Sequence, residues 1–322
     1  MGVQICNEND QVGQPIATFA RTHDTCERAS LATIGNVVLT GATSGLGRLA
    51  ALDLASKGAR LGIVARDPVK AAALHREIDA MGCDGGVDVF IADLSSLVDV
   101  QRVGREISNH FERIDVLINN AGLHAFSQRV TAEGLAEMMA VNYLAPWVLT
   151  DSLWDTLVSS APARVVNVAS GAARHADGVD PTKDLTAIEP YTRRQSMRFY
   201  GRTKLMNIMF TQELGRRLSG TGVTANCCSP GFNVTDLGRE LPFASALRRM
   251  LGWLHVGDPR RGASIIVHLA TDPRFAKVTS GFFSVDDAKV LECPPTGSDA
   301  AAQRALWEAT RALVETVVAS DS

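Results

Sequence analysis

The chain has 322 residues, of which 46% are hydrophobic and 21% are charged, a composition that can bury a sizeable core and stay soluble. Its formal net charge of −3 argues against a nucleic-acid-binding protein and against one steered to acidic membranes. No run of about 18 apolar residues is present, so we predict no membrane-spanning helix.

The cysteines and histidines show no pattern of a metal centre. The six cysteines contain no C-x-x-C pair, which favours buried free thiols in a reducing compartment over disulfides. The seven histidines show neither H-E-x-x-H nor another clustered ligand spacing. We therefore expect a cytoplasmic protein without a metal site.

Regular periodicity begins near residue 36, so residues 1–34 are predicted to form an N-terminal arm. Beyond it, short apolar runs of the buried-strand type alternate with segments of helical spacing. The expected strands are Asn36–Leu39, Leu61–Ala65, Val87–Ile91, Val116–Ile118, Arg164–Val168, Val223–Cys227 and Gly281–Phe283. The expected helices are Leu46–Lys57, Pro68–Ala80, Leu97–Phe111, Asn142–Val158, Tyr200–Leu218 and residues 300–318.

This alternation predicts an α/β fold, a doubly wound parallel sheet with helices on both faces in three layers. No break in composition divides it, so we predict one domain over residues 35–290. Past the breaker Cys293-Pro294-Pro295, residues 291–322 are expected to form a C-terminal helical extension.

A glycine-rich segment, T-G-A-T-S-G-L-G over residues 40–47, lies where the first strand ends and the first helix begins. Glycines let the backbone turn sharply and bring its N–H groups close to a pyrophosphate, and the helix N-terminus adds partial positive charge. No lysine follows Gly47, which argues against an NTPase. Taken alone, the segment also fits an ordinary strand-to-helix turn.

Further motifs follow in order: Asp93-Leu94, N-N-A-G over 119–122, Asn142, Ser170, Tyr200-x-x-x-Lys204 and Pro230-Gly231. With the T-G-x-x-x-G-x-G turn they resemble the short-chain dehydrogenase/reductase family, from about residue 36 to residue 285. The segment Y-G-R-T-K-L-M-N over 200–207 looks most like the retinol dehydrogenase and protochlorophyllide reductase branch, as does Arg66-Asp67. The resemblance implies a Rossmann-type fold that binds a nicotinamide dinucleotide.

The end of the second strand bears on the choice of cofactor. NAD enzymes place a carboxylate there to hold the ribose 2′-hydroxyl, whereas this chain has Ala65 followed by Arg66. A guanidinium suits a 2′-phosphate in charge and geometry, so NADP(H) is predicted. Two observations keep the alternatives open: Arg66 also fits a solvated surface position, and Ser44 stands where many NADP-dependent relatives carry a second basic residue.

By resemblance, Asp93 accepts a hydrogen bond from the adenine amino group, with Leu94 alongside, and residues 119–122 shape the floor beside the adenosine. The alternatives are turn chemistry before a helix for Asp93 and a plain strand-end turn for 119–122. The implied cofactor-binding residues are Gly41, Thr43, Ser44, Gly45, Leu46, Gly47, Arg66, Asp93, Leu94, Asn120, Ala121, Gly122, Tyr200, Lys204, Pro230, Gly231, Asn233 and Thr235.

Tyr200 and Lys204 stand one helical turn apart, so their side chains share a face of the helix. A phenol has an ordinary pKa of about 10. A nearby ammonium and the positive nicotinamide of the oxidised cofactor are expected to lower the pKa of Tyr200. Tyr200 then serves as the general acid or base that exchanges a proton with the substrate oxygen.

Two further catalytic residues rest on the resemblance. Ser170 ends a buried-strand run, where its hydroxyl can reach the ligand crevice and hydrogen-bond the substrate oxygen. Asn142 would hold a water that links Lys204 to solvent. From the residues alone, Ser170 also fits an ordinary strand-end serine and Asn142 an exposed helical asparagine.

Two segments are candidates for the substrate side. Residues Ala172–Phe199 are charged and irregular, and are expected to form a loop. Residues 232–254 are apolar enough to form a wall for a lipophilic substrate, although a lid helix packed on its own domain is the alternative. The apolar positions are Phe232, Leu237, Leu241, Phe243, Leu247, Leu251, Trp253 and Leu254.

Together these features predict an NADP(H)-dependent oxidoreductase that interconverts a carbonyl and an alcohol on a hydrophobic small molecule. One alternative is a C=C (enone) reductase of the same fold. Another is a non-catalytic NADP-binding regulator, against which the presence of both Tyr200 and Lys204 argues. The resemblance also leaves room for a homodimer.

Overall fold

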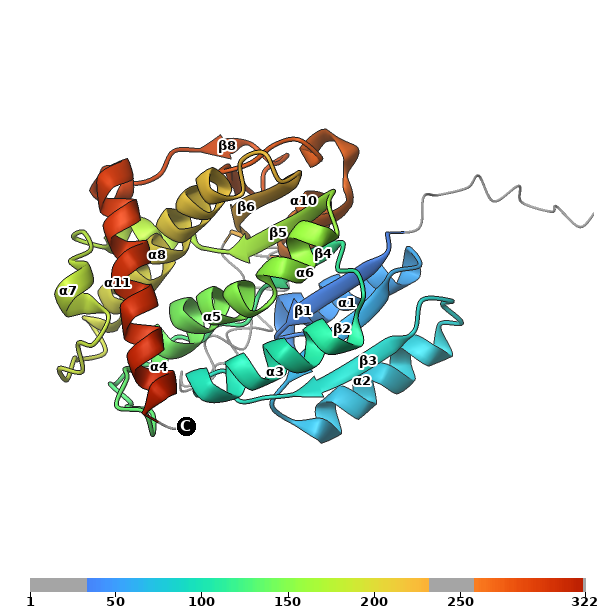
Figure 1. Ribbon diagram of the computed structural model, residues 1–322, viewed down its shortest axis with the longest axis horizontal. Coiled ribbons are helices and arrows are strands. Elements are labelled where there is room, and N and C mark those ends of the chain that lie inside the picture. The colour runs from blue at the N-terminus through green and yellow to red at the C-terminus, as the bar shows by residue number, and fades with distance from the viewer. Residues whose placement is uncertain (1–33, 232–257, 321–322) are drawn as a thin grey trace, which may run out of the picture. The chain divides into compact units, whose positions relative to one another are not determined.

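One mixed sheet runs through the residues that the computed structural model describes, 34–231 and 258–320 (Figure 1). Its strands are β1 (Asn36–Thr40), β2 (Arg60–Ala65), β3 (Val87–Ile91), β4 (Val116–Asn119), β5 (Ala163–Val168), β6 (Val223–Ser229), β7 (Phe282–Ser284) and β8 (Val290–Leu291). They lie in the order β3-β2-β1-β4-β5-β6-β7-β8. All pairs are parallel except β7 with β8.

The described residues also form helices between and after the strands. These are α1 (Gly45–Ser56), α2 (Pro68–Ala80), α3 (Leu97–His110), α4 (Glu137–Met139), the π-helix η1 (Ala140–Leu144), α5 (Ala145–Ser152), α6 (Trp154–Ser159), η2 (Gly171–His175), α7 (Pro181–Asp184), α8 (Ser196–Arg217), α10 (Pro259–Thr271), η4 (Pro273–Phe275), η5 (Pro295–Gly297) and α11 (Ala300–Ala319).

Successive side chains of a strand point to opposite faces of the sheet, so the hydrophobic core has two parts, one on each face. Val38 and Leu117 pack with residues of α3, α5, α8 and α11 on one face. Val37 and Ile118 pack with residues of α1, α2 and α10 on the other. The predicted doubly wound sheet with helices on both faces is therefore confirmed. The strand order reverses between β1 and β4, the place where such sheets bind ligands at their carboxyl ends.

Several elements differ from the prediction. The helix expected to start at Asn142 starts at Glu137, contains the π-helix η1 and is interrupted at Leu153, whose φ and ψ of −102° and 5° lie outside the helical region. The expected last strand is followed by β8, which turns back antiparallel to it. Helix α10 was missed, although Asp258 caps it and Pro259 occupies its first turn, a common start signal.

Helix α11 packs along α8 through a cluster of aromatic rings (Figure 1). The Trp307 ring stacks on Phe210 at a centroid distance of 5.6 Å and meets Trp147 at 5.4 Å. The Arg217 guanidinium lies 4.5 Å from the centroid of the Trp307 ring. Buried rings of this size contribute strongly to the free energy of unfolding.

We therefore expect Trp307→Ala to lower the free energy of unfolding by about 3–5 kcal/mol, because it opens a cavity among buried rings. Urea unfolding followed by circular dichroism measures the change. Arg304→Ala, at an exposed position of the same helix, is the matched control and should stay within about 0.5 kcal/mol of the parent. Equal losses in the two variants would contradict the packing role of Trp307.

Candidate active site

The glycine-rich turn between β1 and α1 is joined to the segment that follows β4. Gly41 and Gly45 adopt φ values of +70° and +55°, which favour glycine. A Cβ at Gly47 would collide with the Gly41 carbonyl oxygen and the Asn120 side chain. The Asn120 side-chain amide donates to the Thr40 carbonyl at 2.9 Å, and its backbone N–H donates to the Thr40 hydroxyl at 3.0 Å. The two predicted motifs, residues 40–47 and residues 119–122, are thus hydrogen-bonded to each other, and we call them together the cofactor ledge.

The residues at this ledge suit the phosphates of a dinucleotide. Ser44 precedes α1 and makes no side-chain hydrogen bond that caps the helix, so the N–H groups of the first turn face no capping side chain. Arg66 follows β2, is exposed, and forms no ion pair or hydrogen bond with the residues that the structure describes. These features fit a phosphorylated dinucleotide: the glycine-rich turn, the N-terminus of α1 without a capping side chain, and the guanidinium of Arg66, unpaired among the described residues.

Asp93 takes part in the turn that its position after β3 suggested. Its Oδ1 accepts hydrogen bonds from the Ser95 backbone N–H at 2.9 Å and the Ser95 hydroxyl at 2.8 Å. Its own N–H donates to Asp99 Oδ2 at 2.6 Å. Leu94 packs against the core beside α3. The turn role of Asp93 is therefore present, and its contact with adenine stays a prediction.

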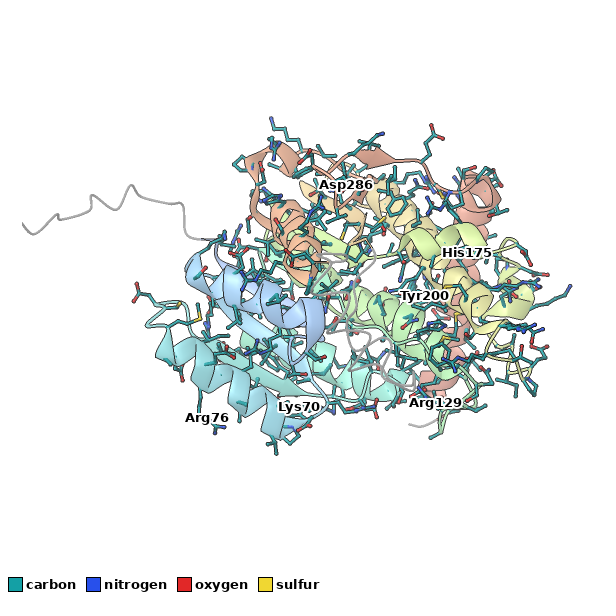
Figure 2. The ribbon with its side chains drawn as sticks, turned by 180° about the vertical axis from the view of Figure 1, so that it is seen from behind. Lys70, Arg76, Arg129, His175, Tyr200 and Asp286 are labelled. Atoms are coloured by element: carbon teal, nitrogen blue, oxygen red, sulfur yellow. The ribbon has the colours of Figure 1, made fainter. Side chains whose placement is uncertain are left out.

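The structure brings together the four residues predicted to be catalytic. Tyr200 and Lys204 lie in α8, and Figure 2 labels Tyr200. Ser170 lies two residues past the end of β5 and precedes η2, and its hydroxyl is hydrogen-bonded to that of Tyr200. The Lys204 Nζ lies 5.8 Å from the Tyr200 ring centroid and donates to the Val168 carbonyl at 2.8 Å. A phenol, a hydroxyl and an ammonium thus meet at the carboxyl end of β5.

Asn142 lies in η1, and its side chain is completely buried, so the exposed-asparagine alternative is wrong. Its Oδ1 accepts from the Leu123 N–H at 2.8 Å. Its Nδ2 donates to the Leu123 carbonyl at 2.9 Å and to the Thr203 hydroxyl at 3.1 Å. These bonds tie the segment after β4 to α8. The proposed water bound by Asn142 stays a prediction.

Asn207 is a neighbour for which the sequence motifs suggested no role. Its Nδ2 donates to the main-chain carbonyl of Asn142 at 2.8 Å. Its Oδ1 is buried and has no hydrogen-bond partner among the described residues. The spacing would have revealed it, because Asn207 follows Lys204 by three positions and therefore shares its face of α8.

Burial shifts the pKa values of the two central groups in opposite directions. It raises the pKa of Tyr200 to about 12, although the hydrogen bond to Ser170 works against the shift. It lowers the pKa of Lys204 to about 8. In the protein by itself the pKa of the phenol is therefore raised, because desolvation by burial is the largest contribution, and the lowering expected with the oxidised cofactor stays a prediction. Tyr200 is a neutral acid at physiological pH.

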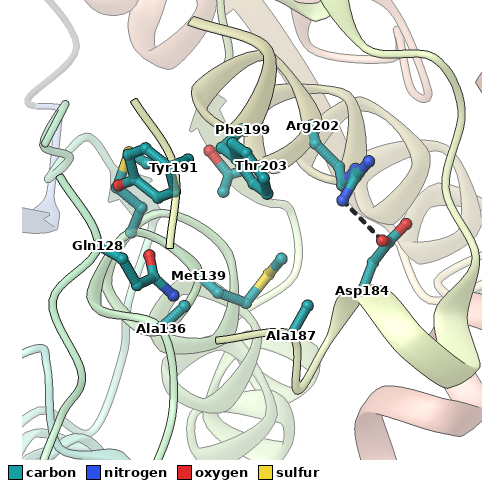
Figure 3. Close-up of a pocket in the computed structure, with 10 residues that line it drawn as sticks. Gln128, Ala136, Met139, Asp184, Ala187, Tyr191, Phe199, Arg202 and Thr203 are labelled. Atoms are coloured by element: carbon teal, nitrogen blue, oxygen red, sulfur yellow. Dashed lines mark hydrogen bonds and ion pairs between the residues drawn. The ribbon is translucent and has the colours of Figure 1, made fainter. Parts of the chain in front are cut away.

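A cavity is lined in part by Thr203 (Figure 3), whose hydroxyl accepts from Asn142 Nδ2. At one side, the Arg202 guanidinium pairs with Asp184 at 2.7 Å, with the side chains only 14% and 12% exposed. The lining is Gln128, Ala136, Met138, Met139, Asp184, Ala187, Tyr191, Phe199, Arg202 and Thr203. Part of the Ala172–Phe199 segment therefore encloses a mainly apolar space, although Ser170, Tyr200 and Lys204 do not line it.

Pro230 and Gly231 follow β6, and Gly231 has a φ of +77°. The neighbouring Ser229 hydroxyl accepts from the Gly171 N–H at 2.9 Å, which holds this strand end beside Ser170. Asn233, Thr235 and the apolar wall predicted over residues 232–254 lie outside the described residues.

Within residues 34–231 and 258–320, no three histidine, cysteine, aspartate or glutamate side chains are grouped so that they could hold a metal ion. No helix in these ranges combines the length and apolar character needed to cross a membrane.

Comparison with known proteins places these features among oxidoreductases. A family model described as short chain dehydrogenase matches residues 35–179. Retinol dehydrogenase 14 of Mus musculus is 35% identical over 291 residues, which cover 86% of this chain and 85% of that protein. Retinol dehydrogenase 12 of Homo sapiens is 35% identical over 271 residues, which cover 84% of this chain and 83% of that protein.

Solved structures share the fold. An uncharacterized protein from Mycobacterium paratuberculosis has a TM-score of 0.69 and 27% identity, covering 87% of this chain and 93% of that one. A protein from Beutenbergia cavernae, proposed to be an NAD(P)-dependent gluconate 5-dehydrogenase, contains NADP at low occupancy. It has a TM-score of 0.61 and 26% identity, covering 79% of this chain and 96% of that one.

The pKa of Lys204 predicts how the affinity for NADPH depends on pH. Because burial lowers this pKa to about 8, the ammonium is charged below pH 8 and becomes neutral above it. We expect the dissociation constant for NADPH, measured by fluorescence titration, to rise above pH 8 by up to about tenfold per pH unit. Lys204→Met should bind weakly with no such step. A wild-type affinity that is constant across pH 8 would contradict the role of Lys204.

Proposed function

Since the chain belongs to the short-chain dehydrogenase/reductase family, we propose that it is an NADP(H)-dependent oxidoreductase that interconverts a carbonyl and an alcohol on a hydrophobic small molecule. The observation that carries this proposal is the Tyr200 hydroxyl, hydrogen-bonded to Ser170, with the Lys204 Nζ 5.8 Å from the centroid of the same ring. This group lies at the carboxyl edge of the sheet, where such folds bind their ligands.

The glycine-rich turn, the ledge at Asn120 and Arg66 would hold the dinucleotide. When bound, NADP(H) supplies or accepts the hydride. Arg66 would contact a 2′-phosphate, since nothing among the described residues neutralises its charge. Support for NADP rather than NAD also comes from the neutral Ala65 in front of it and from the NADP in the Beutenbergia cavernae structure.

The remaining chemistry belongs to the protein. With its pKa raised to about 12, Tyr200 keeps its proton at physiological pH and can donate it to a carbonyl oxygen. The Ser170 hydroxyl would hydrogen-bond the same oxygen and hold it within reach. The charge of Lys204 would stabilise the phenolate that Tyr200 becomes. In the opposite direction, oxidation of an alcohol needs the phenolate at the start, which the positive nicotinamide of the oxidised cofactor would favour.

The curated relatives support a hydrophobic substrate. They include retinol dehydrogenases, whose named substrate is a largely apolar alcohol. We therefore propose bulky hydrophobic aldehydes, ketones or the corresponding alcohols as substrates.

Tyr200→Phe tests the proton transfer, because it keeps the ring and removes the acidic hydroxyl. NADPH oxidation with a panel of aldehydes, ketones and enones identifies the best substrate of the wild-type protein. On that substrate, we expect kcat to fall at least about 10²–10⁴-fold while NADPH still binds. Thr271→Val is the control and should keep its turnover, since it removes a partly buried hydroxyl that donates to the Val267 carbonyl at 2.8 Å within α10, on the other face of the sheet. Near-normal turnover by Tyr200→Phe would overturn the mechanism.

Arg66→Ala tests the choice of cofactor. We expect the wild-type protein to bind NADPH more tightly than NADH, and the variant to narrow this preference by roughly 1–3 kcal/mol. Isothermal titration with both cofactors measures the difference. Arg76→Ala removes another exposed arginine, one that projects from α2 (Figure 2), and should leave the preference unchanged. Equal wild-type affinity for the two cofactors would contradict the assignment.

A further inference from the structure

A continuous stack of side chains ends on the Tyr200 ring. The Arg193 guanidinium lies 4.7 Å from the centroid of the Phe126 ring. The Phe126 and His124 rings are 4.9 Å apart and inclined by 56°. The His124 ring in turn stacks on Tyr200 at a centroid distance of 4.9 Å and an angle of 30°. The stack joins the segment after β4 to the loop before α8.

A hydrogen bond fixes the orientation of the His124 ring within this stack. The Ser196 hydroxyl is buried and donates its single hydrogen to the Arg193 carbonyl at 2.8 Å. The same hydroxyl lies 3.0 Å from His124 Nε2 and therefore accepts a hydrogen from it. His124 thus carries a hydrogen on Nε2, and its ring plane is set by the first residue of α8.

The position of the Tyr200 ring decides where its hydroxyl lies. Of the two side-chain torsions of the phenol, only χ1 moves the hydroxyl oxygen, because that oxygen lies on the axis of χ2; the hydrogen bond to Ser170 therefore depends on χ1. The His124 ring, on the segment after β4, stacks on the Tyr200 ring and resists its swing about χ1. A small loss of alignment in a reacting group lowers the rate strongly.

We propose that His124 is a positioning residue, which holds the Tyr200 ring so that its hydroxyl faces Ser170 and the substrate oxygen. The proposal rests on the proposed function, because it assigns Tyr200 the proton transfer. His124 acts through Tyr200 and takes no proton from the substrate. Its flat ring is the property that the role requires, and its Nε2 hydrogen bond sets the plane of that ring.

Three substitutions separate these properties. His124→Ala removes the ring, and we expect kcat to fall about two- to tenfold while KM and the NADPH dissociation constant stay within about twofold. His124→Phe keeps a stacking ring and should recover most of the kcat. His124→Gln keeps a donor for Ser196 without an aromatic ring and should resemble His124→Ala. His75→Ala, on α2, is the control and should match the wild-type protein.

A second readout is independent of turnover. Labelling with a fluorinated tyrosine gives one fluorine NMR signal for each of the three tyrosines, and Tyr200→Phe identifies the Tyr200 signal. Because a stacked ring shifts such a signal, His124→Ala should move it, His124→Phe should keep it near its wild-type position, and His75→Ala should leave it in place.

The two readouts distinguish the possible failures. An unchanged kcat in His124→Ala, a loss confined to KM, or recovery by Gln but not by Phe would overturn the positioning role. An unchanged Tyr200 signal in His124→Ala would overturn the stack itself. If the wild-type protein reduces no carbonyl compound but the signal moves as expected, the proposed function fails while the contact stands.

Discussion

The buried side chain of Asn142 holds the separate parts of the candidate site in register. A buried amide must satisfy its hydrogen-bonding groups within the protein, and Asn142 does so with Leu123 and Thr203. Through Leu123 it anchors the segment after β4, whose Asn120 is bonded to the glycine-rich turn at Thr40. Through Thr203 it anchors α8 beside Tyr200. The cofactor ledge and the proton donor therefore share one support.

The same burial that stabilises this arrangement also sets its chemistry. Desolvation disfavours the charged form of each group, so it raises the pKa of Tyr200 to about 12 and lowers that of Lys204 to about 8. With these pKa values, the site holds a neutral acid, Tyr200, beside a cation, Lys204, that loses its charge near physiological pH. A charge brought in by a ligand would then shift the pKa values of both groups strongly, because little solvent screens the interaction.

The sequence predicted helices and strands well where residues typical of helix caps and turns mark their ends. Helix α2 matches the expected bounds because Asp67 caps it and Pro68 opens its first turn. Other features depend on contacts distant in the sequence. Hydropathy does not distinguish the π-helical turn of η1 from an α-helix, and Asn142 looks like an ordinary polar helical residue. The contact of His124 with Ser196 joins residues 72 positions apart, so no local pattern could reveal it.

The C-terminal helix links the stability of the fold to the site. Next to Asn142 in η1, the Tyr143 hydroxyl is hydrogen-bonded to Thr310 of α11 at 2.8 Å, and both side chains are fully buried. Near the start of α11, Gln303 donates to the Gly297 carbonyl at 2.8 Å and to the Gln212 side chain of α8 at 2.6 Å. Helix α11 thus supports η1 on one side while Asn207 of α8 supports it on another. Since η1 carries Asn142, a helix far from the glycine-rich turn helps to set the position of the residues around Tyr200.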